Sequence, residues 1–383
     1  MITMLTNRMA GARQCLAPTN HAAGWRVLRM ALAIVVLTTA CAATPTPQPT
    51  NTPAPTTAPI PSAQPTVTQA PKAVPIASTR PTAAPTKVAS KASPTAPAAP
   101  TATAPTTKAS KIKVIATFSV LGDFVRNVAG DVVELTVLVG PDGDVHEFEP
   151  APSDSVRLAE AAVIVENGLG LEGWLENLYI ASGSKAVRVV AGNGITPREI
   201  QDKGKPETDP HIWQNPQNAI QMVKNIEAGL TKADATHADV YKKNAAIYIK
   251  KLQSLDTELA AAIDTLGRDQ RKLVTSHDAL GYFADHYGFE IVGSVIQSLS
   301  TEAGEPSAKD MANLVSGIQS TGARAIFLES MTNPALVERI ATEAGVKIGP
   351  QLYTDALGAP GSEGATYLEA MRHNARAIVE TLR

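Results

Sequence analysis

The sequence predicts an α/β fold of two lobes, each a parallel-type sheet flanked by helices, joined by one long inter-lobe α-helix. Short apolar runs alternate with segments of helical periodicity in residues 111–234 and again in 268–383. That alternation is the pattern of parallel strands with helices on both faces. Between the two halves, residues 235–267 carry apolar side chains in steps of three and four, and neither Pro nor Gly interrupts 235–266.

The N-terminal lobe, predicted at 111–234, begins with a strand at 111–117 (KIKVIAT). Phe118, Leu121, Val125 and Val128 then recur at helical spacing. Further strands are expected at 132–139, 162–166 and 186–190, and further helices at 153–160 and 174–181.

The connecting segment 235–267 is expected to form a single helix of about 30 residues, roughly 45 Å long. A helix of this length would run along both lobes and restrict any hinge motion between them. The C-terminal lobe is predicted at 268–383. Its strands are expected at 272–275, 290–296 and 324–328, and its helices at 279–287, 307–320, 334–344 and 363–382.

The N-terminal residues 1–41 are interpreted as a signal peptide. Arg26 and Arg29 precede an apolar run at 30–37, and small residues follow up to Ala40-Cys41. A cysteine at that point resembles a bacterial lipobox, so Cys41 is the expected site of lipidation. The protein is then expected to be extracytoplasmic and anchored to the membrane, at the cell surface or in the periplasm. The alternative is an ordinary secreted protein with an unmodified Cys41.

Residues 42–110 are interpreted as a disordered tether. They consist almost entirely of Ala, Thr, Pro and Ser and contain 16 of the 28 prolines. Such a composition cannot form a core and favours an extended, semi-rigid chain.

The distribution of charge and cysteine excludes several functions. All 36 acidic residues lie in 111–383, together with 25 Lys and Arg, which gives this region a net charge of −11. An acidic region argues against nucleic-acid binding. The two cysteines, Cys15 and Cys41, both precede this region, so it can hold neither a disulfide nor a thiolate metal site.

Four segments each place a metal-capable side chain after a predicted strand, where open α/β sheets bind ligands. The segments are 143–150 with His146, 209–216 with His211, 274–283 with His277 and 352–357 with Asp355. Three imidazoles and one carboxylate suit a four-coordinate zinc site. Imidazole also suits other late divalent metals, and the carboxylate admits manganese.

The chain resembles the metal-binding receptors of bacterial zinc and manganese ABC importers, the ZnuA/TroA/PsaA-like family of cluster A-I substrate-binding proteins. The segments DVHEFEP, DPHIWQNP, TSHDALGYFADHYG and LYTDAL occur in the family's order and spacing over about 111–383. The resemblance implies that His146 and His211 from the N-terminal lobe and His277 and Asp355 from the C-terminal lobe bind the metal. It also implies a membrane permease with a cytoplasmic ATPase as partners, a monomeric receptor and no enzymatic activity.

Two details bear on the metal and its surroundings. Residues 191–210 hold no histidine, whereas several zinc members carry a His-rich loop before the second ligand. His277 stands where several manganese members have Glu, which favours zinc over manganese. Because ligating histidines usually pass their second N–H to an oxygen, Asp144, Asp278 and Glu329 are the expected outer partners.

Two other functions remain open on the sequence. A zinc hydrolase would need an open coordination position and a general base, yet Asp355 would close that position and no HExxH motif occurs. A surface adhesin or interaction lipoprotein with a structural metal site would be compatible with the long tether.

Overall fold

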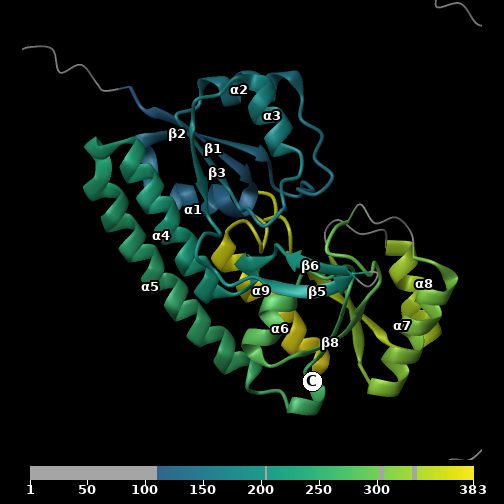
Figure 1. Cartoon of the computed structure of the whole chain (residues 1–383). Helices are drawn as coiled ribbons and strands as arrows, with labels where there is room; N and C mark the ends of the chain where they lie inside the picture. Colours follow the sequence, from purple (N-terminus) through teal and green to yellow (C-terminus); the bar gives the residue numbers. More distant parts are fainter. Residues whose placement is uncertain (1–109, 203–204, 302–305, 330–333) are drawn as a thin grey trace, which may run out of the picture. The chain divides into compact units, whose positions relative to one another are not determined.

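The computed structural model describes residues 110–202, 205–301, 306–329 and 334–383, and these form an α/β fold of two lobes (Figure 1). The predicted signal peptide, Cys41 and the tether at 42–110 lie outside the described residues, apart from residue 110 itself. None of the helices in the described ranges is both long enough and apolar enough to span a membrane.

The N-terminal lobe is built on a four-stranded parallel sheet in the order β2-β1-β3-β4. Val114 and Ala116 on one face of β1 pack toward the helices α1 and α4, whereas Ile115 on the other face packs toward α2 and α3. This alternation follows from the two-residue period of a strand. The strands are β1 Ile112–Phe118, β2 Val133–Val139, β3 Val163–Glu166 and β4 Val187–Val190, and the helices are α1 Ser119–Ala129, α2 Pro152–Glu160, α3 Leu175–Ser182 and α4 Pro216–Ala233.

The connecting helix α5 spans Ala238–Ile263 and packs on α1 and α4 of the first lobe and on α9 of the second. Its 26 residues make it about 39 Å long. It begins later than the expected 235 because a short 3-10 turn precedes it, in which the Asp234 carboxylate accepts a hydrogen bond from the Thr236 N–H.

The C-terminal lobe contains two parallel strand pairs, β7 with β8 and β9 with β10. β7 and β9 lie beside each other, where the Ser276 hydroxyl accepts a hydrogen bond from the Glu329 N–H at 3.2 Å. The strands are β7 Lys272–Thr275, β8 Glu290–Ser294, β9 Ala325–Glu329 and β10 Lys347–Leu352, and the helices are α6 Gly281–Tyr287, α7 Ala308–Thr321, α8 Pro334–Ala344 and α9 Tyr367–Leu382.

Four strands and helices were not expected from the sequence. The strands β5 Arg198–Asp202 and β6 Lys205–Asp209 form an antiparallel hairpin, so the fold is not purely parallel. The helix α4 follows Asn215, whose side chain accepts a hydrogen bond from the Gln217 N–H, and Pro216 begins it. β10 contains Gly349 and Pro350, which disguise its strand pattern. Short 3-10 turns also occur at Gly130–Val132, Ala235–His237, Ile212–Gln214 and Arg268–Gln270.

The two lobes share one hydrophobic core. The buried stripe of α5 packs with residues of the first sheet and with α9 and Phe327 of the second lobe, in one continuous cluster. A separate cluster lies between the other face of β7 and β9 and the helices α7 and α8.

Two polar junctions, the first of them buried, reinforce this continuity between the lobes. The Asp123 carboxylate accepts hydrogen bonds from the Tyr248 hydroxyl at 3.0 Å and from the Tyr367 N–H, at the start of α9, at 3.4 Å. Asp256 of α5 contacts His286 and Tyr287 of α6. The lobes are therefore joined over a broad contact and not by a flexible strand.

Gly229 is expected to be required for the contact between α4 and β4. A Cβ at Gly229 would overlap Val189 Cγ2 and lie 2.9 Å from Val189 Cγ1. Gly229→Ala should therefore lower the free energy of unfolding by roughly 1–2 kcal/mol, since overpacking outweighs the better helix propensity of alanine. Gly317→Ala on α7 is the matched control, because its Cβ would lie 3.9 Å from Val292 Cγ1. It should stabilise by about 0.5–1 kcal/mol. The free energies of unfolding are measured with urea. If both variants were stabilised, or both destabilised, this explanation would be contradicted.

Glu172 is expected to make stability depend on pH. Burial raises the pKa of the Glu172 carboxyl to about 7, although hydrogen bonds from the Asn167 N–H and the Thr117 hydroxyl oppose the shift. Between its usual pKa of 4.5 and 7 the unfolded chain is ionised at this residue while the folded chain holds the proton. The free energy of unfolding should therefore fall by about 3 kcal/mol as pH rises through this window.

Glu172→Gln, which cannot ionise, should remove this part of the slope. Urea unfolding of the wild type and of Glu172→Gln from pH 4.5 to 8 gives the free energy of unfolding of each protein as a function of pH. The difference between the two curves is the contribution of Glu172. Parallel curves would mean that Glu172 ionises normally in the folded protein.

Candidate metal centre

The four predicted donor residues converge between the lobes from four separate loops. His146 follows β2, His211 follows β6, His277 follows β7 and Asp355 follows β10. One possible ligand atom from each lies within 4.8 Å of all the others. His211 and Asp355 are completely buried, His277 is buried, and the His146 side chain is 6% exposed.

The spacing of these atoms suits coordination of one small cation. The Nε2 atoms of His146 and His211 are 3.3 Å apart, and Asp355 Oδ2 lies 2.9 Å from His277 Nε2. Asp355 Oδ2 is 3.5 Å from His146 Nε2, and Asp355 Oδ1 is 3.5 Å from His211 Nε2. Donors bound at about 2.0–2.1 Å in a tetrahedron would lie roughly 3.3 Å apart.

The charges in the cluster support one another. Burial alone would lower the pKa of His277, but the Glu329 and Asp355 carboxylates outweigh it and raise that pKa well above its usual value. Burial would likewise raise the pKa of Asp355, but the neighbouring His277 and His211 hold it well below its usual value. Asp355 is therefore an anion in a cluster of nitrogen donors.

Two buried carboxylates contact the Nδ1 atoms of the His211 and His277 rings, on the side away from the cluster. Asp209 Oδ1 lies 2.9 Å from His211 Nδ1 and accepts the His211 backbone N–H at 3.0 Å. Glu329 Oε2 lies 2.5 Å from His277 Nδ1, and Oε1 accepts the backbone N–H groups of Ser276 and His277. Once a cation replaces the proton on Nε2, a carboxylate on Nδ1 would keep the Nε2 lone pair directed at the cluster, which is the tautomer a metal requires.

Of the three predicted outer partners, Glu329, Asp144 and Asp278, only Glu329 contacts a ligand ring. Glu329 contacts the His277 ring and also accepts the Thr354 hydroxyl at 2.8 Å, next to Asp355. Asp144 accepts the backbone N–H of His146 and the hydroxyl of Thr301, so it shapes the loop and does not contact a ring. Asp278 lies near Ser294, and its carboxylate accepts no hydrogen bond from a ligand ring.

Asp209 is the partner that sequence reasoning missed. It precedes His211 by two residues in the segment DPH, and its carboxylate turns back onto both the backbone N–H and the ring of that histidine. An aspartate two residues before a candidate ligand was the available signal, since Asp side chains commonly hydrogen-bond backbone groups two residues on.

The Asp355 loop of the second lobe is tied to the first lobe. The Thr354 carbonyl accepts hydrogen bonds from the Trp213 indole and the Gln214 amide, both at 2.8 Å. The Leu357 N–H donates to the Ser119 hydroxyl, and its carbonyl accepts the Asp142 N–H. The fourth donor is thus positioned by contacts from the lobe that carries His146 and His211.

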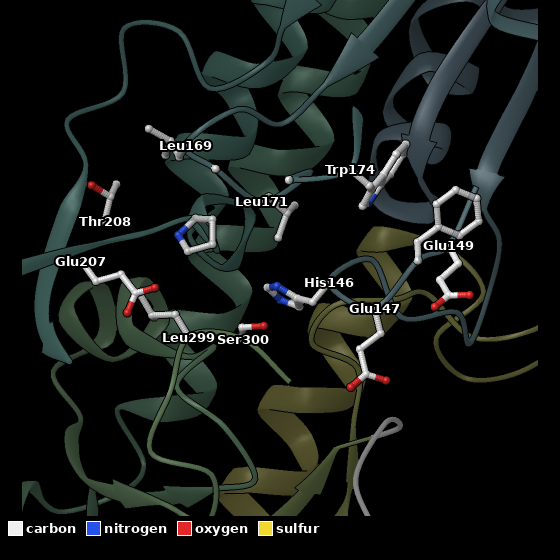
Figure 2. Close-up of a pocket in the computed structure, with 14 residues that line it drawn as sticks. His146, Glu147, Glu149, Leu169, Leu171, Trp174, Glu207, Thr208, Leu299 and Ser300 are labelled. Carbon is white, nitrogen blue, oxygen red and sulfur yellow. The ribbon is translucent and has the colours of Figure 1, made fainter. Parts of the chain in front are cut away.

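A cavity of about 840 Å³ opens beside the cluster, with residues of both lobes in its wall. Figure 2 shows the His146 ring directed into this cavity, with Glu147 on the same segment and Glu207, Leu299 and Ser300 around it. Of the four donor residues, His146 is the one that lines this cavity. It is therefore the side of the cluster that a solute meets first.

Comparison with known proteins agrees with this arrangement. Residues 114–381 match the family described as zinc-uptake complex component A, periplasmic. The chain is 34% identical over 272 residues to a manganese-binding lipoprotein, MntA, of Halalkalibacterium halodurans, covering 71% of this chain and 88% of that protein.

Two solved structures have the same fold. The periplasmic zinc-binding protein TroA of Treponema pallidum is 30% identical, with a TM-score of 0.67 over 71% of this chain and 99% of its own. A manganese-bound periplasmic metal-binding protein from Candidatus Liberibacter asiaticus is 29% identical, with a TM-score of 0.65 over 71% of this chain and all of its own.

These matches confirm the resemblance that the four segments predicted. They also confirm the predicted absence of enzymatic activity, because the family consists of substrate-binding transport proteins. The chain belongs to the family of the periplasmic zinc-uptake complex component A, the metal-binding receptors of ABC transporters.

Proposed function

We propose that this protein captures a divalent transition metal outside the cytoplasm with His146, His211, His277 and Asp355 and delivers it to an ABC permease. The observation that carries the proposal is the buried convergence of these four donors between two lobes. Asp355 Oδ2 and His277 Nε2 lie 2.9 Å apart as an ion pair, yet neither they nor Asp355 Oδ1 make a hydrogen bond of good geometry within the described residues. Buried polar atoms are normally paired, so such atoms suit a cation as their partner.

Zinc is the proposed cargo, with manganese next. Three imidazole nitrogens bind zinc more tightly than manganese, in keeping with the general order of affinities. The carboxylate of Asp355, whose two oxygens face different imidazoles, keeps manganese as a weaker alternative. Relatives with this fold include proteins named as manganese, iron and zinc binders, which is why manganese remains the second candidate.

The proposed location is the outer side of the membrane, with a lipid anchor at Cys41 and the tether 42–110 between anchor and receptor. Support comes from the charged, apolar and small residues that precede Cys41. Several relatives are named as lipoproteins of ABC transporters. The receptor would act as a monomer and meet its permease and cytoplasmic ATPase at the membrane surface.

Removal of any one donor is expected to abolish tight binding. Alanine in place of His146, His211, His277 or Asp355 should weaken zinc binding by more than the 10- to 100-fold typical of a lost outer partner. His373→Ala is the matched control, because His373 contacts Glu363 and the Gln351 carbonyl, apart from the cluster. Competition with a fluorescent chelator measures each affinity. A donor variant that kept wild-type affinity would remove that residue from the site.

The order of metal affinities is expected to be zinc above manganese. The measurement is a competitive titration of the purified protein with both ions, together with elemental analysis of protein taken directly from cells. Equal or tighter binding of manganese would refute the proposed preference while leaving the four-donor site intact.

A further inference from the structure

Arg198 connects the metal cluster to the opposite lobe. It begins the hairpin strand β5, and its backbone N–H donates to the Tyr282 hydroxyl of α6 at 2.7 Å. Its guanidinium Nε donates to Asp285 Oδ2 at 2.8 Å, and Nη1 donates to Asp209 Oδ2 at 3.3 Å. Figure 1 shows the β5–β6 hairpin lying against the second lobe beside α6.

Asp209 is the point where this contact reaches the cluster. Its carboxylate is completely buried, with Oδ1 on His211 and Oδ2 on Arg198. Its backbone carbonyl accepts the Tyr282 hydroxyl at 2.9 Å. His211 holds Oδ1 through its backbone N–H and its ring, and Arg198 supplies the partner of Oδ2, so that contacts on both oxygens fix the orientation of this buried carboxylate and compensate its charge.

Gly281, the first residue of α6, makes room for this arrangement. A Cβ there would overlap Arg198 Nη1 and lie 2.7 Å from both Arg198 Cζ and Asp209 Oδ2. Gly281 does not have a positive φ, so its backbone conformation does not call for glycine. The space taken by the guanidinium and the carboxylate explains the residue.

We propose that Arg198 is a positioning residue of the metal site. Arg198 links Asp209 to α6, the helix that follows His277. Because Asp209 contacts the His211 ring, this link fixes the position of His211 relative to His277. The inference rests on the proposed function. Its consequence is kinetic: loss of the clamp should speed metal dissociation and leave association unchanged, because Arg198 does not line the cavity beside His146.

The test measures zinc affinity and the rates of association and dissociation in the full-length protein. Arg198→Gln should weaken affinity about tenfold, the lower end for an outer partner, with the change in the dissociation rate. Arg198→Lys should give an intermediate value, since one ammonium cannot hold both carboxylates in the geometry of the guanidinium. Binding stoichiometry should stay at the wild-type value in both variants.

Two further variants separate positioning from general stability. Arg188→Gln removes another arginine–carboxylate contact, to Glu166 in the first lobe, and should leave zinc binding unchanged. Gly281→Ala keeps every charge and should reproduce the faster dissociation by displacing the guanidinium and the Asp209 carboxylate from each other. In the double variant Arg198→Gln/Gly281→Ala, the second change should add little, because both act on the same contact.

The outcomes distinguish this inference from the proposed function. Failure of the wild-type protein to bind zinc or manganese would refute the proposed function. The wild-type protein could bind zinc while Arg198→Gln and Gly281→Ala both have affinities and dissociation rates within twofold of the wild-type values. That result would overturn the role of Arg198 and leave the proposed function standing. Additive effects in the double variant would also overturn it. If Arg198→Gln does not fold, Arg198→Lys decides the question through its dissociation rate, because it keeps the positive charge and loses only the guanidinium geometry.

Discussion

The rest of the site depends on a carboxylate that has no access to water. Asp355 is completely buried, and an isolated buried anion is strongly unfavourable. Three imidazoles around it, and a cation among them in the proposed function, are what make its position tolerable. The arrangement needs loops from both lobes, because His146 and His211 come from one and His277 and Asp355 from the other. Closure of the two lobes is therefore part of the stability of the site.

The donor set could be predicted from the sequence because the four segments occur together in the order and spacing of a known family. Each segment alone, such as DPHIWQNP around His211 or TSHDALGY around His277, is a weak signal. The strands of the first sheet and the helix α5 were also predictable, since their apolar periods are strong and uninterrupted. Glu329 was recognised because it ends a strand that leads to the site.

The remaining features depend on contacts between residues far apart in the chain. The hairpin β5–β6 begins Arg198-Glu199 and has no apolar period to reveal it, since contacts with α6 hold it in place. The bond between the Tyr282 hydroxyl and the Asp209 carbonyl joins residues 73 positions apart, and no local pattern encodes it. Asp209 contacts a ligand ring and Asp278 does not, although both are acids close to a ligand in the sequence. Only the folded structure distinguishes between them.

The exposure of His146 on the cavity wall has a consequence for how an ion loses its water. A cavity of about 840 Å³ is large enough to admit a fully hydrated cation. The other three donors are buried behind His146, so in the proposed function His146 would replace one water while most of the hydration shell is still intact. Dehydration would then proceed one ligand at a time toward the interior. The barrier to uptake would be divided into small steps, and an ion that exchanges its water slowly would be held back at the first of them.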